Sequence, residues 1–461
     1  LKVVGRAGIG VDNIDINAAT MRGVIVMNTP GANSMATAEQ TMALMLAVNR
    51  HTAQAYASLL AGEWARSQVV GTELFGKTLG IIGFGRIGRL VAERAKAFGM
   101  EVLAFDPYVS EEVGREMDVE LLDLDDLLPQ ADIITLHTAV TPETTHMINT
   151  EAIAQMKDGV IVINVARGKL VDEPALAEAL KSGKVAAAGV DVYSKEPPTD
   201  NPLIGLPNVV HTPHLGASSK EAQRNVAVQI VEQVVDALRG KDFRNALNMP
   251  FQASVGFDTI RPYMQLGAKL GLLHAQVAAK PITQLEIEVN GDDLEEMVTA
   301  IAAGALQGLL MPTHPHANPI NAPVIANEMG ISVTQTIGQN PLDYPNLISC
   351  RARWDGGERL LAGVLFAGGE PRIVRWNKYT LDARPEGSVL LLQNQDVPGV
   401  IGQIGTILAA YDVNIGEWRM GRDKPGGEAL SVINLDSAPP QEALDALKRI
   451  SAITELMLVQ L

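Results

Sequence analysis

The sequence predicts an α/β fold whose main sheet is parallel and doubly wound, followed by two α+β regions. In the first half, short apolar runs alternate with helical patterns, as in the β-α-β units of parallel sheets. Past about residue 248 this alternation stops, and the order of helices and strands changes. The apolar runs of the first half lie at 78–82, 101–105, 133–136, 160–164, 188–192 and 209–211.

Length and composition exclude several classes of protein. At roughly 150 residues per domain, the 461 residues correspond to about three domains. The 53 acidic residues outnumber the 37 basic ones, and the net charge of −16 argues against nucleic acid as a partner. Cys350 is the single cysteine, which fits the reducing cytoplasm. No apolar run reaches the roughly 18 residues of a membrane span, so we expect no membrane partner.

The chain opens on an apolar strand at 3–4 and a glycine-rich turn at 5–10, and a second strand is predicted at 24–27. A helix follows at 34–51. Because residue 1 is Leu and the first strand begins at once, we expect the chain to start inside a domain.

The stretch from Lys77 to Asp106 forms one predicted β-α-β unit with the pattern G-x-G-x-x-G. Gly83 permits a tight turn, Gly85 lets the backbone approach a pyrophosphate, and Gly88 allows close packing of helix and strand. The N-terminus of the following helix offers free N–H groups to phosphate. Asp106 ends the second strand, about 20 residues past the glycines, where a carboxylate accepts hydrogen bonds from ribose hydroxyls and repels a 2′-phosphate. These features predict a Rossmann-like sheet that binds NAD rather than NADP.

Polar residues follow the strands of this sheet at the points where the strands end. Ligands of doubly wound sheets bind beyond the carboxyl ends of the strands. We therefore expect the chemistry there, near the nicotinamide end of the cofactor. The residues at these positions are Thr138, Ala166, Arg167, Asp191, Glu196 and His214.

Arg167, Glu196 and His214 together suit the oxidation of a 2-hydroxy acid. His214 can take the hydroxyl proton while hydride leaves the carbon for the nicotinamide. Arg167 can grip the substrate carboxylate with its planar fork, and Glu196 can orient the ring of His214. Taken singly, such a histidine is more often a cap, such an arginine a solvated group, and E-P-P a turn. The shared place of the three residues at the strand ends favours the catalytic interpretation.

The other histidines indicate no metal site. His314 and His316, in P-T-H-P-H-A-N-P, resemble ligands, but no Cys, Asp or Glu accompanies them at ligand spacing. We therefore expect no bound metal. The histidines on or beside apolar elements, which we interpret as structural, are His51, His146, His211 and His274.

The region from 253 to 386 predicts a separate α+β module. It also holds a basic cluster in an otherwise acidic chain, and this cluster is either a solvated surface strand or an anion site. The cluster comprises Arg372, Arg375, Lys378 and Arg384. The module combines predicted helices at 260–279 and 295–310 with strands at 284–289, 347–354, 360–366 and 372–376.

Residues 387–461 predict the order strand, helix, strand, strand, helix, strand, which is ferredoxin-like. A strand at 389–393 leads into D-x-P-G at 396–399, a helix covers 400–410, and V-N-I at 413–415 opens the next strand. Asp396 and Asn414 are either ligand-binding residues or only cap and turn residues.

Several motifs carry a resemblance to a known family. The segments G-R-A-G-I-G-V-D-N-I-D, G-F-G-R-I-G, N-V-A-R-G-K-L-V-D-E, V-D-V-Y-S-K-E-P-P and H-T-P-H-L-G-A-S-S resemble the D-2-hydroxyacid dehydrogenase family. Over the whole chain the likeness is to its long-form branch, the D-3-phosphoglycerate dehydrogenases, whose tail is an ACT domain. The resemblance implies NAD-dependent oxidation of 3-phosphoglycerate to 3-phosphohydroxypyruvate in L-serine biosynthesis.

The resemblance also implies roles for individual residues. It makes Arg167, Glu196 and His214 catalytic. The implied NAD contacts beside the glycines are Arg86, Ile87, Asp106, Thr138, Ala166 and Asp191. The residues implied at or near the substrate are Arg6, Gly8, Ile9, Gly10, Asn33 and Arg66. In the tail, Asn394, Asp396 and Asn414 stand where the family binds a serine effector.

The resemblance further implies a division into domains and an assembly. Residues 1–32 and 217–252 would form an incomplete, flavodoxin-like substrate domain, 33–216 the NAD domain, 253–386 the intervening domain and 387–461 the ACT domain. It implies a homotetramer and a further N-terminal segment that this chain lacks. Two rival functions stay open: another 2-hydroxyacid dehydrogenase, such as a glyoxylate or hydroxypyruvate reductase, or a non-catalytic NAD-binding amino-acid sensor.

Overall fold

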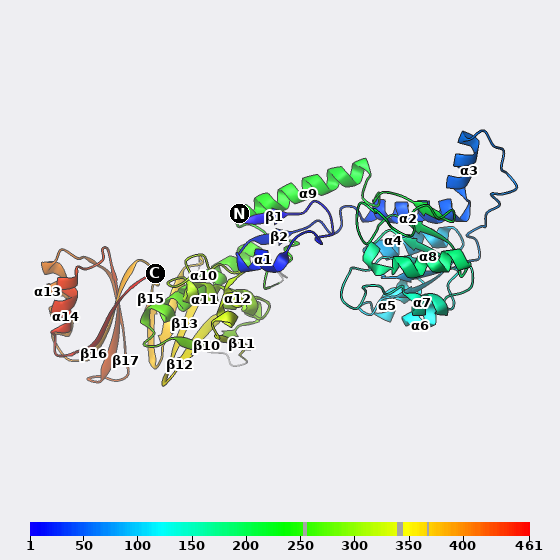
Figure 1. Ribbon diagram of the computed structural model, residues 1–461. Helices are drawn as coiled ribbons and strands as arrows, with labels where there is room; N and C mark the ends of the chain where they lie inside the picture. The colour runs from blue at the N-terminus through cyan, green and yellow to red at the C-terminus, as the bar shows by residue number, and fades with distance from the viewer. Residues whose placement is uncertain (252–255, 339–343, 367) are drawn as a thin grey trace. The chain divides into compact units, whose positions relative to one another are not determined.

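The computed structural model describes residues 1–251, 256–338, 344–366 and 368–461. The chain divides into two compact units (Figure 1). The first unit comprises Leu1–Arg6, Asp12–Asn28 and Val231–Leu461, and the second comprises Ala7–Val11 and Thr29–Ile230. The boundary expected between residues 252 and 253 lies outside the described residues.

The second unit is built on a seven-stranded parallel sheet. In spatial order its strands are β5 (Glu120–Leu121), β4 (Glu101–Phe105), β3 (Thr78–Ile82), β6 (Ile133–Leu136), β7 (Val160–Asn164), β8 (Val185–Val190) and β9 (Val209–His211). The order reverses at β3, which lies between β4 and β6 and so forms the switch point of a doubly wound sheet.

Helices cover both faces of this sheet (Figure 1). Within β3, Ile81 belongs to the hydrophobic core on one face and Ile82 to the core on the other, and both are fully buried. The first core contains α2 (Ser34–Asn49) and α4 (Arg86–Ala97), and the second contains α6 (Leu124–Leu127), α7 (Thr150–Gln155) and α8 (Glu173–Ser182). The remaining helices are α3 (Thr52–Leu60), α5 (Glu111–Glu116) and the 3₁₀ turn η1 (Gly168–Leu170). Helix α9 (Lys220–Leu238) runs from the second unit into the first, with the division at residues 230 and 231.

The doubly wound fold is confirmed, with differences at element ends. The strand expected at 188–192 is β8, which begins at Val185 and ends at Val190 because Asp191 bonds the loop after β9 instead of continuing the ladder. The helix expected at 34–51 ends at Asn49, since His51 adopts a left-handed φ of 48°. The short elements α3 and β5 were not predicted from the sequence.

The N-terminal part of the first unit is a small parallel pair. Strand β1 (Val3–Gly5) pairs with β2 (Ile25–Met27), and α1 (Ile16–Met21) connects them. The side chain of Asn248 completes the backbone hydrogen bonding here, accepting from the N–H of Val26 at 2.9 Å and donating to the carbonyl of Val24 at 2.8 Å.

The central part of the first unit is a six-stranded sheet packed against helices. In spatial order its strands are β11 (Ser332–Ile337), β10 (Ile282–Asn290), β12 (Leu347–Trp354), β13 (Gly357–Leu365), β14 (Pro371–Trp376) and β15 (Tyr379–Ala383). The helices are α10 (Phe257–Val277), η2 (Asp292–Met297), α11 (Val298–Leu310) and α12 (Ala322–Glu328). The helix expected at 295–310 therefore begins three residues late, because residues 292–297 form a 3₁₀ turn.

The C-terminal part is the expected ferredoxin-like module. Its antiparallel sheet has the order β17 (Ile415–Arg422), β18 (Glu428–Leu435), β16 (Ser388–Gln395) and β19 (Ile453–Gln460). Leu390 and Leu392 pack with α13 (Val400–Ala410) and α14 (Gln441–Lys448), whereas Leu391 and Leu430 join the core of the central part. Both faces of the sheet are thus covered. Among the helices of the described residues, none has the length and apolarity to cross a membrane.

Burial makes His274 a pH-sensitive position in the core of the first unit. Its ring on α10 is fully buried, and Nε2 donates to the carbonyl of Cys350 at 2.9 Å. Burial lowers the pKa of His274 to about 4. An unfolded histidine titrates near 6.5, so between about pH 6.5 and 4 the unfolded chain binds a proton that the folded chain does not. This histidine therefore lowers stability progressively as the pH falls through that range.

We expect His274→Gln, which keeps a donor but does not titrate, to flatten the fall in stability between pH 6 and 5 by roughly 1 kcal/mol per pH unit. Urea unfolding at pH 7, 6 and 5 measures the slope. His316→Gln, at an exposed histidine, is the control and should retain the wild-type slope. An unchanged slope in His274→Gln would contradict the prediction.

Candidate active site

The carboxyl ends of the central strands lie in one row across the sheet of the second unit. Parallel pairing sets Ile82 beside Leu136, Leu136 beside Asn164, Asn164 beside Val190, and Val190 beside His211. Neighbouring strands are about 4.8 Å apart, so the loops that leave this row are adjacent in space. These loops carry the predicted residues Gly83, Thr138, Ala166, Arg167, Asp191, Glu196 and His214.

In the glycine loop after β3, Gly83 and Gly88 pack closely against neighbouring backbone, whereas Gly85 faces open space. Gly83 has a φ of 98°, and a Cβ there would lie 2.8 Å from the carbonyl oxygen of His137. A Cβ on Gly88 would lie 2.2 Å from the carbonyl oxygen of Gly83. At Gly85 no described atom lies within 4 Å of the Cβ position. The open space at Gly85, before the N-terminus of α4 with Arg86 and Ile87, fits a pyrophosphate.

Asp106 is fixed at the end of β4. Its Oδ2 accepts from the N–H of Phe84 at 2.9 Å, and its Oδ1 accepts from the N–H of Tyr108 at 3.0 Å. A carboxylate has about four lone-pair positions, so both oxygens can still accept ribose hydroxyls. The residues present therefore fit the adenosine half of NAD.

Glu196 and His214 are in direct contact, as the sequence predicts. Nδ1 of His214 lies 2.8 Å from Oε2 of Glu196, and Oε1 of Glu196 accepts from the N–H of Tyr193 at 3.1 Å. The side chains of His214 and Glu196 are 48% and 38% exposed, so solutes can reach them. Because the carboxylate accepts the Nδ1 proton, Nε2 is the ring nitrogen that can act as a base.

Asp191 holds the backbone on which His214 sits. Its carboxylate is fully buried and accepts from the N–H groups of Leu215 at 2.7 Å and Gly216 at 2.8 Å, and from the hydroxyl of Thr212. The carbonyl of Asp191 accepts from the N–H of His214 at 2.8 Å. These bonds hold His214 at a φ of 56°. A contact between Asp191 and NAD stays a prediction.

Asn164 shapes the turn that presents Arg167, and sequence reasoning missed it. Its Nδ2 donates to the carbonyl of Arg167 at 2.9 Å, and its Oδ1 accepts from the N–H of Ala166 at 3.0 Å. Nη1 of Arg167 donates to the carbonyl of Ala166 at 2.7 Å. The available signal was a polar residue at the end of an otherwise apolar strand.

Burial and nearby carboxylates act on Tyr193, which follows β8. Burial, and then the negative charges of Asp191, Glu196 and Glu173, raise the pKa of Tyr193 to about 12. The phenol is therefore neutral at physiological pH, with its hydroxyl 3.3 Å from Nδ1 of His211. Burial alone lowers the pKa of His137 to about 3, so that ring is neutral as well.

The residues expected near the substrate fall in both units. Arg6 belongs to the first unit, where its N–H donates to the carbonyl of Met27 at 2.8 Å. Gly8 in the second unit exchanges backbone and side-chain bonds with Thr29, and Ile9 and Gly10 follow it. Asn33 precedes α2 and is 8% exposed, and its buried Oδ1 accepts no hydrogen bond from the described residues. Such an orphaned oxygen suits a ligand. Arg66 lies exposed in the segment after α3.

The residues expected to bind an effector lie far apart within one chain. Oδ2 of Asp396 accepts from the N–H of Gly426 and from Arg422, both at 3.1 Å, and these bonds lower the pKa of the Asp396 carboxyl. Asn414 donates to Asp436 at 2.7 Å. Asn394, two residues before Asp396, is buried and donates to the carbonyl of Gln395.

Strand register gives the distance between the end of the sheet near Asp396 and the end near Asn414. Glu428, opposite Gln395, marks the end of β18 near Asp396, and Leu435, opposite Ile415, marks the end near Asn414. Seven residue steps at about 3.3 Å place the two ends about 23 Å apart.

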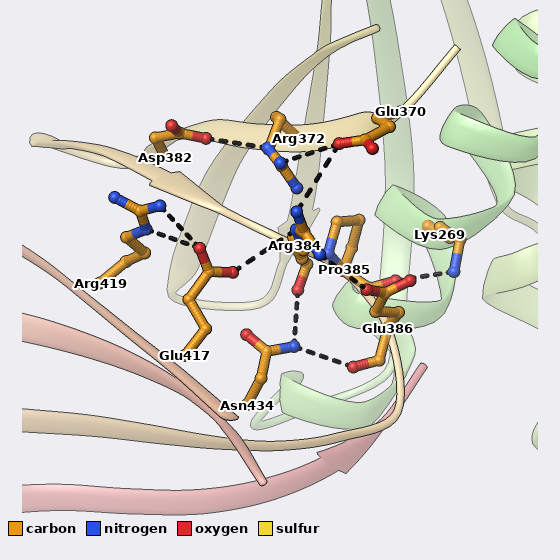
Figure 2. A network of polar contacts seen from close by, with 10 residues as sticks. All are labelled: Lys269, Glu370, Arg372, Asp382, Arg384, Pro385, Glu386, Glu417, Arg419 and Asn434. Atoms are coloured by element: carbon orange, nitrogen blue, oxygen red, sulfur yellow. Dashed lines mark hydrogen bonds and ion pairs between the residues drawn. The ribbon is translucent and has the colours of Figure 1, made fainter. Parts of the chain in front are cut away.

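Two members of the basic cluster, Arg372 and Arg384, belong to a network of ion pairs with acidic side chains (Figure 2). Arg372, with a 9% exposed side chain, lies 3.0 Å from Glu370 and 3.2 Å from Asp382. Arg384 pairs with Glu370, Glu386 and Glu417 at 3.8 to 3.9 Å. Lys378 lies 2.7 Å from Glu428, and Arg375 donates to the carbonyl of Asn377. Arg375, Lys378 and Arg384 are exposed, as expected of a solvated surface strand, whereas Arg372 is buried between two acids. The anion site stays a prediction.

The fold and its glycine loop define the class. A doubly wound parallel sheet with a dinucleotide loop at its switch point is the framework of the nicotinamide-dependent dehydrogenases. Within the described ranges, no group of three or more His, Cys, Asp or Glu side chains could hold a metal ion.

Comparisons with known proteins narrow the class. Family models match residues 42–216 as the NAD-binding domain of D-isomer specific 2-hydroxyacid dehydrogenases, 259–377 as the D-3-phosphoglycerate dehydrogenase intervening domain, and 388–452 as an ACT domain. The D-3-phosphoglycerate dehydrogenases of Methanocaldococcus jannaschii and Bacillus subtilis are 43% and 42% identical to it, over 100% of this chain and 88% of each relative. The chain belongs to the D-3-phosphoglycerate dehydrogenase family.

A solved structure is also similar to about half of this chain. The crystal structure of a glyoxylate reductase from Paecilomyes thermophila is 37% identical, with a TM-score of 0.51. The match covers 54% of this chain and 75% of that one.

We expect Asp106→Ala to weaken NAD binding at least tenfold, because charge-assisted hydrogen bonds to the ribose contribute about 1.5–3 kcal/mol. Discrimination against NADP should fall at the same time, since the carboxylate no longer repels a 2′-phosphate. Titration of both cofactors by calorimetry measures the two effects. Asp125→Ala, at an exposed acid on α6, is the control, and an unchanged cofactor preference in Asp106→Ala would refute the ribose contact.

Proposed function

We propose that this chain oxidises 3-phosphoglycerate to 3-phosphohydroxypyruvate with NAD, the first step of L-serine biosynthesis. The observation that carries the chemistry is the 2.8 Å contact between Nδ1 of His214 and Oε2 of Glu196. The substrate is supported by the names of relatives that match along the whole chain. NAD, when bound, supplies the acceptor for the hydride.

The chain's own residues hold the substrate and move its proton. Arg167 binds the substrate carboxylate as a planar fork. Nε2 of His214 takes the proton of the reacting hydroxyl, and the adjacent Glu196 carboxylate stabilises the positive ring that forms. Asp191 keeps the His214 loop in place through backbone bonds, so the ring reacts without reorganising first.

We expect the protein to produce NADH from 3-phosphoglycerate, and His214→Asn to lower kcat by roughly 10²–10⁴, the usual contribution of a general base. Asn tolerates the left-handed backbone that His214 adopts. His146→Asn is a matched control, because His146 is exposed and has a similar φ of 55°. Steady-state absorbance of NADH measures both variants.

The outcome also separates the rival functions. Faster turnover of glyoxylate or hydroxypyruvate than of the phosphorylated substrate would identify another 2-hydroxyacid dehydrogenase. The similarity to a glyoxylate reductase is the observation that supports this rival. NAD binding without turnover of any 2-hydroxy acid would leave a non-catalytic amino-acid sensor. Near wild-type turnover of His214→Asn would remove His214 from the mechanism.

L-serine is the proposed effector, bound between ACT domains of two copies of the chain. Asp396 and Asn414 lie at opposite ends of one sheet, about 23 Å apart by strand rise, and one amino acid cannot reach both. A site that uses both residues therefore needs two chains. The amide of Asn394 lies on β16, beside Asp396.

We expect serine to inhibit the enzyme, and Asp396→Asn and Asn414→Ala each to raise the half-inhibitory concentration about tenfold or more, as loss of a hydrogen bond to a charged group costs about 1.5–3 kcal/mol. Inhibition curves measured at fixed substrate give the shift. Glu442→Gln, an exposed acid on α14, should leave the curve unchanged. Wild-type activity that is insensitive to serine would exclude this effector.

The assembly proposed is a homotetramer in the cytoplasm. Large apolar side chains are exposed in one stretch of the second unit, which is unusual for a monomer's surface. They include Tyr56, Leu60, Trp64 and Phe75, which are 66%, 72%, 81% and 77% exposed.

The buried Cys350, whose thiol pKa burial raises, suits a reducing compartment. The division into four domains with boundaries at 32, 216, 252 and 386 belongs to the same proposal.

A further inference from the structure

Glu173, the first residue of α8, binds the loop that leads to Glu196. Its side chain is 7% exposed, and Oε1 accepts from the N–H of Ser194 at 2.9 Å. Oε2 accepts from the hydroxyl of the same Ser194 in a short contact. A buried carboxylate is costly unless it is hydrogen-bonded, so both bonds constrain the loop strongly.

Glu173 does not serve as the cap of its own helix. The preceding Asp172 is the N-cap, and its side chain accepts from the N–H of Ala175 at 3.1 Å. An acid in a first turn that acts on the helix dipole is normally exposed to solvent. Both oxygens of the Glu173 carboxylate accept hydrogen bonds from Ser194, which lies outside α8. Its role is therefore directed at the loop after β8.

A second contact joins the same two segments. A Cβ on Gly168 would lie 1.9 Å from the carbonyl carbon of Tyr193 and 2.2 Å from the nitrogen of Ser194. The turn after Arg167 thus packs directly on the loop that carries Glu196. From Arg167 the chain reaches Glu173 through the 3₁₀ turn η1. One short segment therefore carries both Arg167, the residue proposed to bind the substrate, and Glu173, which binds the loop at Ser194.

Hydrogen bonds connect the Ser194 loop to Glu196 and His214. The N–H of Tyr193, next to Ser194, donates to Oε1 of Glu196, and Oε2 of Glu196 contacts His214. We propose that Glu173 is a positioning residue: through Ser194 it sets Glu196 against His214 and fixes both relative to Arg167. This inference rests on the proposed function only for its kinetic consequences, because the contacts themselves lie within the folded chain.

Glu173→Ala should lower kcat roughly 10–100-fold, because a misplacement of about 1 Å can cost about 10²-fold. The Kd for NAD should change less than about twofold, since Asp106 and the glycine loop fit the adenosine half of the cofactor and do not contact Glu173. Glu173→Gln should recover most of the rate, as its amide can accept from the Ser194 N–H and donate to the hydroxyl oxygen. Glu151→Ala, at an exposed acid in the first turn of α7, is the matched control.

A double variant tests whether the effect runs through Ser194. If it does, Glu173→Ala combined with Ser194→Ala should be no slower than Glu173→Ala alone. NAD binding verifies that each variant is folded, and Glu173→Gln and Ser194→Ala keep the test informative if Glu173→Ala is unstable. Additive losses, equal losses in the Gln and Ala variants, or a kcat within about twofold of wild type would overturn the proposal.

A crystal structure of Glu173→Ala with NAD provides a readout that does not depend on the substrate. We expect Ser194 and Glu196 to move and the contact between Nδ1 of His214 and Oε2 of Glu196 to lengthen beyond hydrogen-bonding distance. An unchanged contact would overturn the positioning role even if the wild type is fully active. If Glu196 is displaced in the variant but the wild type turns over no substrate, the positioning role stands and only the proposed function is contradicted.

Discussion

The buried carboxylate of Asp191 is the interaction on which the catalytic end of the sheet depends. A charge that is fully removed from water requires several hydrogen bonds, and Asp191 obtains them from Thr212, Leu215 and Gly216 after β9. Those bonds join the ends of β8 and β9 and hold the turn in which His214 has a positive φ. The ring of His214 reaches Glu196 because the backbone beneath it has been fixed in this way.

The rest of the site consists of loops supported by side chains that do not themselves take part in the chemistry. Asn164 forms the turn before Arg167, and Glu173 binds the loop before Glu196. Each support is a polar group that is buried and bonded to backbone. Parallel register then brings the supported loops to one edge, since five consecutive strands end at paired positions. The positions of Arg167, Glu196 and His214 thus depend on supporting residues that hydrogen-bond the backbone of their loops.

In the first unit, the packing of the ferredoxin-like sheet against the central part brings charged side chains of the two parts into contact. The outer face of the ferredoxin-like sheet packs into the core of the central part, so Arg384 meets Glu417 of β17 and Lys378 meets Glu428 of β18. Some acidic partners of these residues, Glu370, Asp382 and Glu386, lie close by in the sequence. Glu417 and Glu428 lie about 30 and about 50 residues beyond Arg384 and Lys378, and no local pattern connects those two pairs.

The sequence by itself determined the doubly wound sheet and the cofactor loop and predicted the set Arg167, Glu196 and His214, because strand periodicity, glycine spacing and positions at strand ends are local properties. The tertiary structure alone decided that Asp191 supports the His214 loop, that Glu173 faces Ser194 rather than solvent, and that Arg372 of the basic cluster is buried between Glu370 and Asp382. Each of these depends on which segments meet after folding, and a carboxylate at the start of a helix looks the same in the sequence whether it caps that helix or binds a loop 21 residues away. Burial and partner, which give such a group its function, arise only when the sheet brings distant segments together.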